Sequence, residues 1–129
     1  MPDPTDDPSS AYWGFLEGGQ FRFQHCRACA NAWLPARSQC PKCWSPDWEW
    51  EDASGGGRVV SWVVFHTAFH EAFKERLPYN VAVVELEEGP RLITNLTNLQ
   101  DAPGDVTDKP VRLVIERDMD RALPRFRLV

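Results

Sequence analysis

The sequence has few residues of the kinds that carry metal or covalent chemistry: three histidines and four cysteines among 129 residues. It has no run of about 18 apolar residues, which excludes a transmembrane helix. Its first residues, MPDPTDDPSS, have neither the basic end nor the apolar stretch of a secretory signal. We therefore expect a cytoplasmic protein that does not associate with membranes.

Positive charge is also scarce. Lys and Arg number 14 against 19 Asp and Glu, which gives a net charge of −5. Proteins dedicated to nucleic acid neutralise phosphates with Lys and Arg, so this balance argues against such a partner. The composition, 43% hydrophobic and 26% charged, is that of a globular chain. A chain this short buries only about two-thirds of its unfolded surface, so an additional cross-link is expected.

The cysteines lie in one segment and can provide that cross-link. Cys26 and Cys29 form one Cys-x-x-Cys pair, ten residues follow, and Cys40 and Cys43 form a second pair. Two cysteines three residues apart can point at one ion from a tight turn, and two such turns complete a tetrahedral site. We predict one structural zinc ion held by the four thiolates. A site that leaves no position for water or substrate is not catalytic.

Other interpretations of the cysteines stay open. Four cysteines also allow two disulfides in three pairings, although a chain without a signal peptide is expected in a reducing compartment, where disulfides are rare. A redox-active Cys-x-x-Cys usually begins one helix rather than forming two facing turns. Spacing alone does not separate zinc from iron.

The segment around the cysteines is poor in aliphatic residues. Leu34 is the only Leu, Ile or Val between residues 21 and 50. Metal binding must therefore supply much of the folding free energy of this segment. Six aromatic residues are available to cover the site: Phe21, Phe23, Trp33, Trp44, Trp48 and Trp50.

The chain divides into four segments. Residues 1–9, with three prolines and three aspartates, are expected to form a flexible tail. Residues 10–50 are expected to hold a short helix, capped by Ser10, and the metal-binding ribbon. Residues 51–57 are polar and rich in glycine, which predicts a hinge. Residues 58–129 are expected to form the second module.

Five strand patterns in this second module predict a small closed β-barrel. The first pattern is long enough to bend and to serve both halves of the barrel, which favours an OB-type barrel over a sandwich. A short turn at residues 88–90 joins the second and third patterns into a hairpin. The fold class is thus mainly β, with an N-terminal helix and a metal ribbon before a five-stranded OB-fold. The patterns span residues 57–69, 80–87, 91–97, 110–117 and 125–129.

No catalytic residue is predicted. His66 and His70 are four residues apart, but no Ser or Cys forms a nucleophile motif with them, and no GxSxG is present. The glycines at 55–57 lack the Lys-Ser/Thr pair and the helix that follow a phosphate-binding loop. His25 directly precedes Cys26, but with four thiolates available we expect it to be a neighbour of the metal and not a ligand.

Two apolar segments are larger than a small lone domain needs. Each either covers the chain's own barrel and metal site or contacts a partner or an acyl ligand, and the sequence leaves both interpretations open. One segment lies in the first helix, and the other is a loop that mixes aromatic with basic residues. The candidate contact residues are Tyr12, Trp13, Phe15 and Leu16 in the helix, and Phe69, Phe73, Lys74, Arg76 and Tyr79 in the loop.

The order of motifs resembles a known family. The paired cysteine turns are followed by GGRVVSWVVFH, by LPYNVAVVELEEGPRLITNL and by PVRLVIE. This series is similar to the domain-of-unknown-function family thirty-five, a rubredoxin-like zinc ribbon joined to an OB-fold. The similarity covers residues 11–128, and the segment 77–96 is its most specific part.

The resemblance implies an accessory role and not an enzyme in its own right. Members of this family partner thiolase-fold enzymes that act on acyl-CoA, including thiolases, acyltransferases and the aldolases of steroid side-chain degradation. The partner carries the catalytic residues, and the OB-fold docks beside its acyl-CoA entrance. The implied assembly is a hetero-oligomer. Two other functions stay open: a nucleic-acid-binding ribbon and OB module, and a self-sufficient enzyme.

Overall fold

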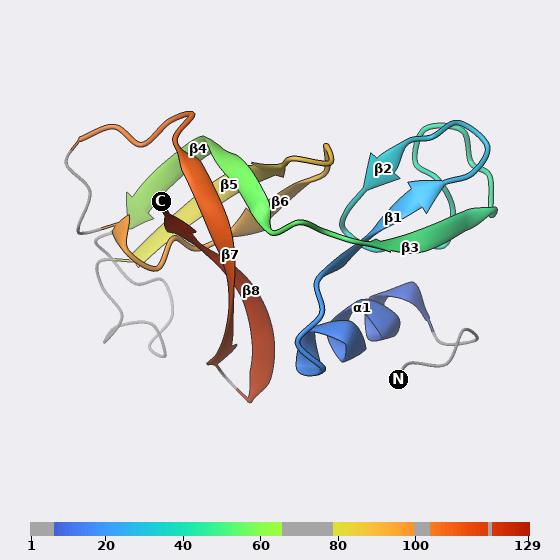
Figure 1. The fold of residues 1–129 in the computed structure, drawn as a ribbon, viewed down its shortest axis with the longest axis horizontal. Coiled ribbons are helices and arrows are strands. Elements are labelled where there is room, and N and C mark those ends of the chain that lie inside the picture. The colour runs from blue at the N-terminus through green and yellow to red at the C-terminus, as the bar shows by residue number, and fades with distance from the viewer. Residues whose placement is uncertain (1–6, 66–78, 100–103, 119) are drawn as a thin grey trace.

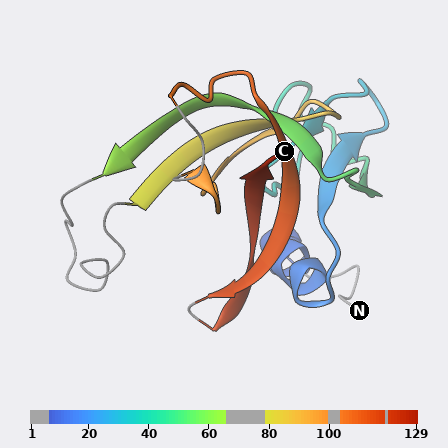
Figure 2. The same cartoon turned by 60° about the vertical axis from the view of Figure 1, so that its left-hand side comes forward.

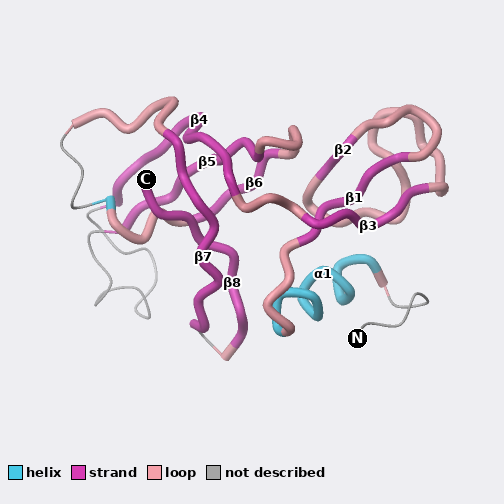
Figure 3. The backbone as a smooth tube through the Cα atoms, in the orientation of Figure 1, coloured by secondary structure: helices cyan, strands magenta, loops and turns pink. Residues whose placement is uncertain are grey.

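The computed structural model describes residues 7–65, 79–99, 104–118 and 120–129 (Figure 1). Strands dominate both modules (Figure 3), which confirms the predicted fold class. No helix in the described part of the chain is long and apolar enough to span a membrane. The elements in chain order are α1 (Pro8–Glu17), β1 (Arg22–Cys26), β2 (Ala32–Trp33), β3 (Trp48–Asp52), β4 (Gly56–Phe65), β5 (Tyr79–Leu86), β6 (Arg91–Thr94), β7 (Pro110–Asp118) and β8 (Arg121–Leu128).

Helix α1 begins earlier than the sequence predicts. Asp7, not Ser10, is the N-cap, and its carboxylate accepts a hydrogen bond from the Ser10 amide at 3.3 Å. Asp is among the preferred N-cap residues, and Pro8 fits the first helical turn because its missing amide hydrogen needs no acceptor there. The last two residues of the expected tail, Pro8 and Ser9, are therefore helical. The helix ends before Gly18, as expected.

The ribbon is a three-stranded antiparallel sheet in the order β2-β1-β3. Strand β1 pairs with β3 along its whole length, from Arg22 opposite Asp52 to Cys26 opposite Trp48. The predicted hinge at 51–57 is shorter than expected, because β3 continues to Asp52 and β4 begins at Gly56. Two contacts hold this segment to the start of β1. Arg22 forms an ion pair with Asp52 at 2.8 Å, and the Ala53 amide donates to the Phe21 carbonyl at 3.0 Å.

The second module is a curled five-stranded sheet in the order β6-β5-β4-β7-β8, with every adjacent pair antiparallel (Figure 2). The long strand β4 pairs with β5 and, at its start, with β7. A register shift between Val59 and Ser61 in β4 marks a bulge, which is how a strand bends to serve both sides of a barrel. An isolated parallel bridge between Leu96 and Phe126 joins the two ends of the sheet.

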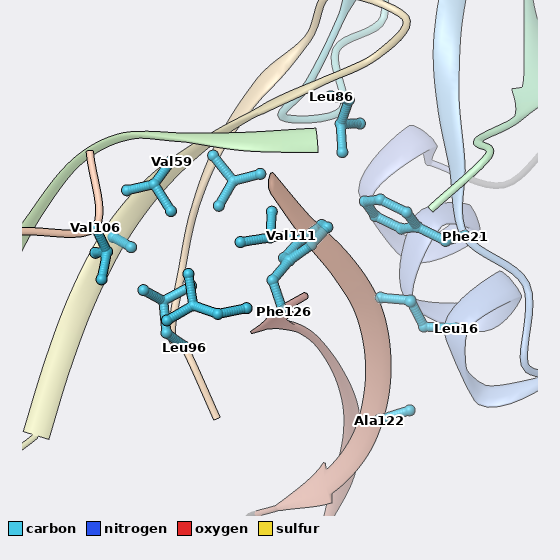
Figure 4. Close-up of a cluster of buried hydrophobic side chains, with 12 residues drawn as sticks. Leu16, Phe21, Val59, Leu86, Leu96, Val106, Val111, Ala122 and Phe126 are labelled. Carbon is cyan, nitrogen blue, oxygen red and sulfur yellow. The ribbon is translucent and has the colours of Figure 1, made fainter. Parts of the chain in front are cut away.

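One hydrophobic core joins the barrel to the helix and to the start of the ribbon. Leu16 and Phe21 point toward the barrel side chains (Figure 4), and the Phe21 ring lies 6.4 Å from the ring of Phe126. Phe21 was expected to cover the metal site, but it belongs to this core. The modules therefore pack on each other. The buried members are Leu16, Phe21, Val59, Ala82, Val84, Leu86, Leu96, Val106, Val111, Ala122, Phe126 and Leu128.

Replacing Leu16 by Ala tests whether α1 belongs to the core of the barrel. Leu16 is 1% exposed, and truncating a buried Leu costs about 2–5 kcal/mol of unfolding free energy. We expect urea unfolding, followed by tryptophan fluorescence, to show a loss in this range. The control Ile93→Ala trims a side chain that is 75% exposed and should cost less than about 0.5 kcal/mol. Equal, small losses for both variants would contradict the shared core.

Candidate metal centre

The two cysteine pairs form two turns of the same shape. In the first turn, the Ala30 amide donates to the Cys26 carbonyl at 3.0 Å and the Cys26 amide donates to the Asn31 carbonyl at 2.8 Å. In the second, the Trp44 amide donates to the Cys40 carbonyl at 2.9 Å and the Cys40 amide donates to the Ser45 carbonyl at 3.0 Å. The sequence repeat Cys-x-x-Cys is thus a structural repeat, and each turn presents two sulfur atoms.

Each turn contains one residue with left-handed backbone geometry. Ala30 has φ 65° and Trp44 has φ 67°, and each directly follows the second cysteine of its pair. Glycine adopts this conformation without cost, whereas other residues pay about 1–3 kcal/mol. Such strain persists only where the surroundings fix the backbone, and a shared metal ion supplies that constraint.

The four sulfur atoms are arranged for one metal ion. Cys26 and Cys43 have their Sγ atoms 3.6 Å apart, as do Cys29 and Cys40, and all four lie within 4.8 Å of one another. Tetrahedral zinc with Zn–S distances of about 2.3 Å requires sulfur atoms about 3.8 Å apart. All four cysteines are free, so the disulfide interpretation is wrong and the prediction of one metal ion is confirmed.

Backbone amides stabilise the thiolates. The Lys42 and Cys43 amides donate to Cys40 Sγ at 3.4 and 3.5 Å, and the Cys29 amide donates to Cys26 Sγ at 3.4 Å. Burial alone raises the pKa of Cys40, but the amides of Cys43 and Lys42 outweigh burial and lower that pKa to about 6. The Cys29 amide likewise lowers the pKa of Cys26. A metal that binds thiolates therefore meets two sulfur atoms, those of Cys26 and Cys40, that lose their protons readily. The pKa of Cys43 is raised by burial and by its hydrogen bonds to the other three thiols, so this thiol keeps its proton more firmly until a metal binds.

Tryptophan side chains shield the inner side of the site. Cys26 and Cys40 are fully buried and pack with Trp33, while Trp48 lies with its ring 6.4 Å from that of Trp33. Trp44 does not cover the metal site as expected, because its side chain is 71% exposed. Four thiolates fill the coordination sphere of a tetrahedral ion, which leaves no open position for a substrate. The site is therefore structural and cross-links the ribbon.

His25 is a neighbour of the site, as predicted, and contacts carboxylates of β3. Its Nδ1 lies 3.3 Å from Oε1 of Glu51 and 4.0 Å from Oε1 of Glu49. The register of the sheet explains this placement, because His25 lies opposite Glu49.

The helix residues proposed as contacts divide into two groups. Phe15 is 6% exposed and packs on Trp50 with ring centroids 5.3 Å apart, and Leu16 is in the core. For Phe15 and Leu16 the interpretation as partner contacts is wrong, since burial leaves them almost no surface to offer. Tyr12 and Trp13 are half-buried, and their rings meet edge to face at 5.1 Å. Burial raises the pKa of the Tyr12 hydroxyl, which stays neutral.

The other candidate contacts belong to the segment between β4 and β5. Phe69, Phe73, Lys74 and Arg76 lie outside the described residues, as do His66 and His70. Tyr79 begins β5 and pairs through its backbone with Phe65.

A groove of about 640 Å³ was not foreseen from the sequence. Residues from five segments line it: α1, the loop after β2, β5, β6 with the adjoining Asn95, and β8. No local pattern marks such a site, because the segments are far apart in the chain. The structure places Pro124 inside β8, whereas the predicted final strand began one residue later, at Arg125.

Replacing Cys40 by Ser tests the metal site and its role in folding. We expect the unaltered protein, made without added metal, to carry about one zinc ion per chain by plasma mass spectrometry. Cys40→Ser should lose the metal and unfold the ribbon. It should also lower the stability of the barrel, because Phe21 belongs to the barrel core. The control Ser38→Ala alters an exposed side chain in the same loop and should keep the zinc. Absence of bound metal in the unaltered protein would refute the assignment.

Known proteins share both modules. Residues 13–49 match the family model for the rubredoxin-like zinc ribbon domain of ChsH2, and residues 50–116 match the model for its C-terminal OB-fold domain. A "Probable enoyl-CoA hydratase alpha subunit" of Thermomonospora curvata is 38% identical over 128 residues, which is 98% of this chain and 39% of that protein. This chain thus spans less than half the length of that relative.

Two further similarities concern named complexes. The benzoylsuccinyl-CoA thiolase subunit BbsA of Thauera aromatica is 27% identical over 115 residues, 88% of this chain and 72% of that protein. A chain in the solved structure titled "Ltp2-ChsH2(DUF35) aldolase" superposes with a TM-score of 0.80 and is 36% identical, with 98% of both chains covered. With both modules matched in order, the chain belongs to the ChsH2 family of rubredoxin-like zinc ribbon and OB-fold proteins.

Proposed function

We propose that this chain is a non-catalytic accessory subunit that binds a thiolase-fold enzyme acting on acyl-CoA. The similarity across 98% of both chains to a chain of the Ltp2-ChsH2(DUF35) aldolase carries the proposal. The names of a thiolase subunit and a hydratase subunit among the relatives support an acyl-CoA enzyme as the partner. The proposed assembly is a hetero-oligomer in which the partner supplies the reacting groups.

The chemistry of the described side chains favours a non-catalytic role. Its metal site is closed by four thiolates, so it offers no Lewis-acid position to a substrate. The described carboxylates with lowered pKa values owe the shift to ordinary neighbours. Glu17 is held by Arg117, Glu85 by Arg91, and Asp105 by Thr107. Such ion pairs and turn bonds are structural arrangements.

Aromatic side chains supply the proposed contact. Tyr12 and Trp13 keep part of their surface exposed along the groove, next to Arg121, whose guanidinium carbon lies 4.6 Å from the Trp13 ring centroid. Aromatic anchors that enter water-excluded pockets commonly carry interface energy. The basic and aromatic loop residues stay part of the proposal, as contacts to the partner or to acyl-CoA at the shared interface: Phe69, Phe73, Lys74, Arg76 and Tyr79.

The finer assignment follows the family resemblance. We propose that the partner acts in steroid side-chain or lipid degradation, by thiolysis, acyl transfer or retro-aldol cleavage. Four free thiols fit a reducing compartment, which supports a cytoplasmic location.

Affinity purification of the tagged full chain from its source tests the proposal. We expect a thiolase-fold enzyme to co-purify in a fixed ratio. The purified complex should turn over an acyl-CoA substrate, and this chain alone should not. Robust acyl-CoA turnover by the isolated chain would refute the accessory role. Retention of single-stranded DNA at low salt, without any enzyme, would favour a nucleic-acid module instead.

Replacing Trp13 by Ala should weaken the complex. Loss of an aromatic anchor costs about 2 kcal/mol or more of binding free energy, which is roughly 30-fold in affinity. The control Trp44→Ala removes an exposed tryptophan of the ribbon that does not line the groove, and it should leave affinity unchanged. Surface plasmon resonance measures affinity, and melting temperature reports folding. If Trp13→Ala lowers only the melting temperature, Trp13 is a core residue and not a contact.

A further inference from the structure

The groove of about 640 Å³ lies where the barrel is least closed. We call it the seam groove, because β6 forms one side and β8 the other, while Tyr12 and Trp13 of α1 and Leu34 of the loop after β2 also line it. These two strands are the ends of the sheet order. In Figure 1, α1 lies below the ribbon and beside β8. The lining is mainly apolar, and its Ile93 side chain is 75% exposed.

The closing ladder of the barrel stops at Pro124. The Phe126 amide donates to the Asn95 carbonyl at 3.1 Å, and the Thr97 amide donates to the Phe126 carbonyl at 2.8 Å. Continuing this parallel ladder by two residues requires the amide of residue 124 to donate to the Ile93 carbonyl. Proline has no amide hydrogen, so that bond cannot form. The Pro124 carbonyl instead accepts from the Thr94 hydroxyl at 2.8 Å.

The β8 side of the seam has most of its groups occupied. Toward one end, the Ala122 amide donates to the Glu17 carboxylate of α1 at 3.0 Å. Toward the other, Leu128 exchanges two hydrogen bonds with the side chain of Asn98, at 2.8 and 3.1 Å. Together with the bonds of Phe126 and Pro124, these contacts leave little on β8 for a new strand to pair with.

The β6 side is different. The Leu86 amide donates to the Pro90 carbonyl at 2.8 Å, which makes this a hydrogen-bonded pair of the β5–β6 hairpin. Because bonded and non-bonded pairs alternate in an antiparallel ladder, the backbone groups of Arg91 and Ile93 point away from β5. Asn95 follows the same alternation and faces Phe126. Among the described residues, nothing pairs with the outward amide and carbonyl of Arg91 or Ile93.

A partly buried guanidinium adds an unmet hydrogen-bond donor. Arg125 of β8 lines the groove, its side chain is 18% exposed, and its Nη2 donates to Asp118 at 2.7 Å. Its Nε is buried, and none of the described residues accepts a hydrogen bond from it. A buried guanidinium donor is best satisfied by a carboxylate, which forms short charge-assisted hydrogen bonds with it.

We propose that the seam groove accepts an extended segment of the partner enzyme, which adds as a strand along β6 and places a carboxylate at Arg125. This inference rests on the proposed function for the identity of the partner. An added strand satisfies all three features: its backbone pairs with Arg91 and Ile93, its apolar side chains cover the lining, and its acidic group meets Arg125. The free groups of Arg91 and Ile93 lie about 7 Å apart, the two-residue repeat of a strand.

Two other occupants are outcomes of the test. An acyl chain covers the apolar lining but has no amide or carbonyl series to pair with β6. A second copy of this chain has free strand edges on β2 and β3 of the ribbon, and light scattering of the free chain tests that occupant. Strand addition is a known mode of peptide recognition in which main-chain hydrogen bonds give the affinity and side-chain pockets give the specificity.

Replacing Ile93 by Pro isolates the backbone contribution. The Ile93 amide points away from β5, so proline removes the outward donor without breaking the β5–β6 ladder, and proline is tolerated on strand edges. We expect Ile93→Pro to weaken binding of the co-purified thiolase-fold enzyme at least about tenfold, through the lost bond and the bulk of the ring. The matched control Ile93→Val keeps the amide and should stay within about twofold. Zinc content and melting temperature report folding of both variants.

Hydrogen exchange provides a readout that needs no variant. In the full complex of unaltered proteins, the Ile93 amide should exchange at least about tenfold more slowly than in the free chain. Fragmentation that resolves single amides separates Ile93 from Leu92 and Thr94, which already pair with β5. Arg125→Lys should also weaken the complex, because lysine keeps the charge but lacks the Nε donor.

The outcomes separate the two proposals. If the enzyme binds the unaltered chain, binds Ile93→Pro equally well and leaves Ile93 exchange unchanged, strand addition is wrong and the accessory function stands. If no thiolase-fold enzyme co-purifies, both fall. Two results would assign the groove to another occupant and overturn the inference. One is slower hydrogen exchange of the groove amides when decanoyl-CoA is added without the enzyme. The other is a dimer of the free chain, detected by light scattering, in which the Ile93 amide is protected from exchange.

Discussion

Ligation of one metal ion by four thiolates is the constraint on which the arrangement of the molecule depends. The ribbon has almost no aliphatic side chains, so its three short strands have little else to hold them. Cys26 ends β1, and Phe21 lies just before that strand and inserts into the barrel core. A single strand thus transmits the position of the metal to the barrel. The loop after β2, which lines the seam groove, lies between the two cysteine pairs.

A second attachment sets the position of α1. The carboxylate of Glu17 accepts hydrogen bonds from Arg117 at 2.7 Å and from the Ala122 amide at 3.0 Å. The bond from Arg117 is the main reason that the pKa of Glu17 lies below its usual value, so the carboxylate keeps its charge down to lower pH than a free glutamate. These bonds tie the last turn of the helix to β7 and β8. Helix, ribbon and barrel together therefore define the walls of the groove.

Local features were predictable from the sequence, and long-range features were not. The cysteine turns follow from spacing alone, because each turn is made within a few residues. The hairpin at residues 88–90 and the strands follow from alternation and turn chemistry. By contrast, burial of Phe15 and Phe21 and exposure of Trp44 depend on which element packs on which, and single-sequence patterns do not contain that information. The helix start was missed because Asp7 precedes a proline that the sequence interpretation assigned to a tail.

Pro124 has a consequence for how this protein avoids joining with itself. An unpaired strand edge in water templates the growth of further sheet, and natural proteins blunt such edges. Here the free edge of β6 borders the groove that Tyr12, Trp13 and Leu34 also line. In the proposed complex the partner's strand covers this edge, so binding the partner also removes a place at which further sheet could grow.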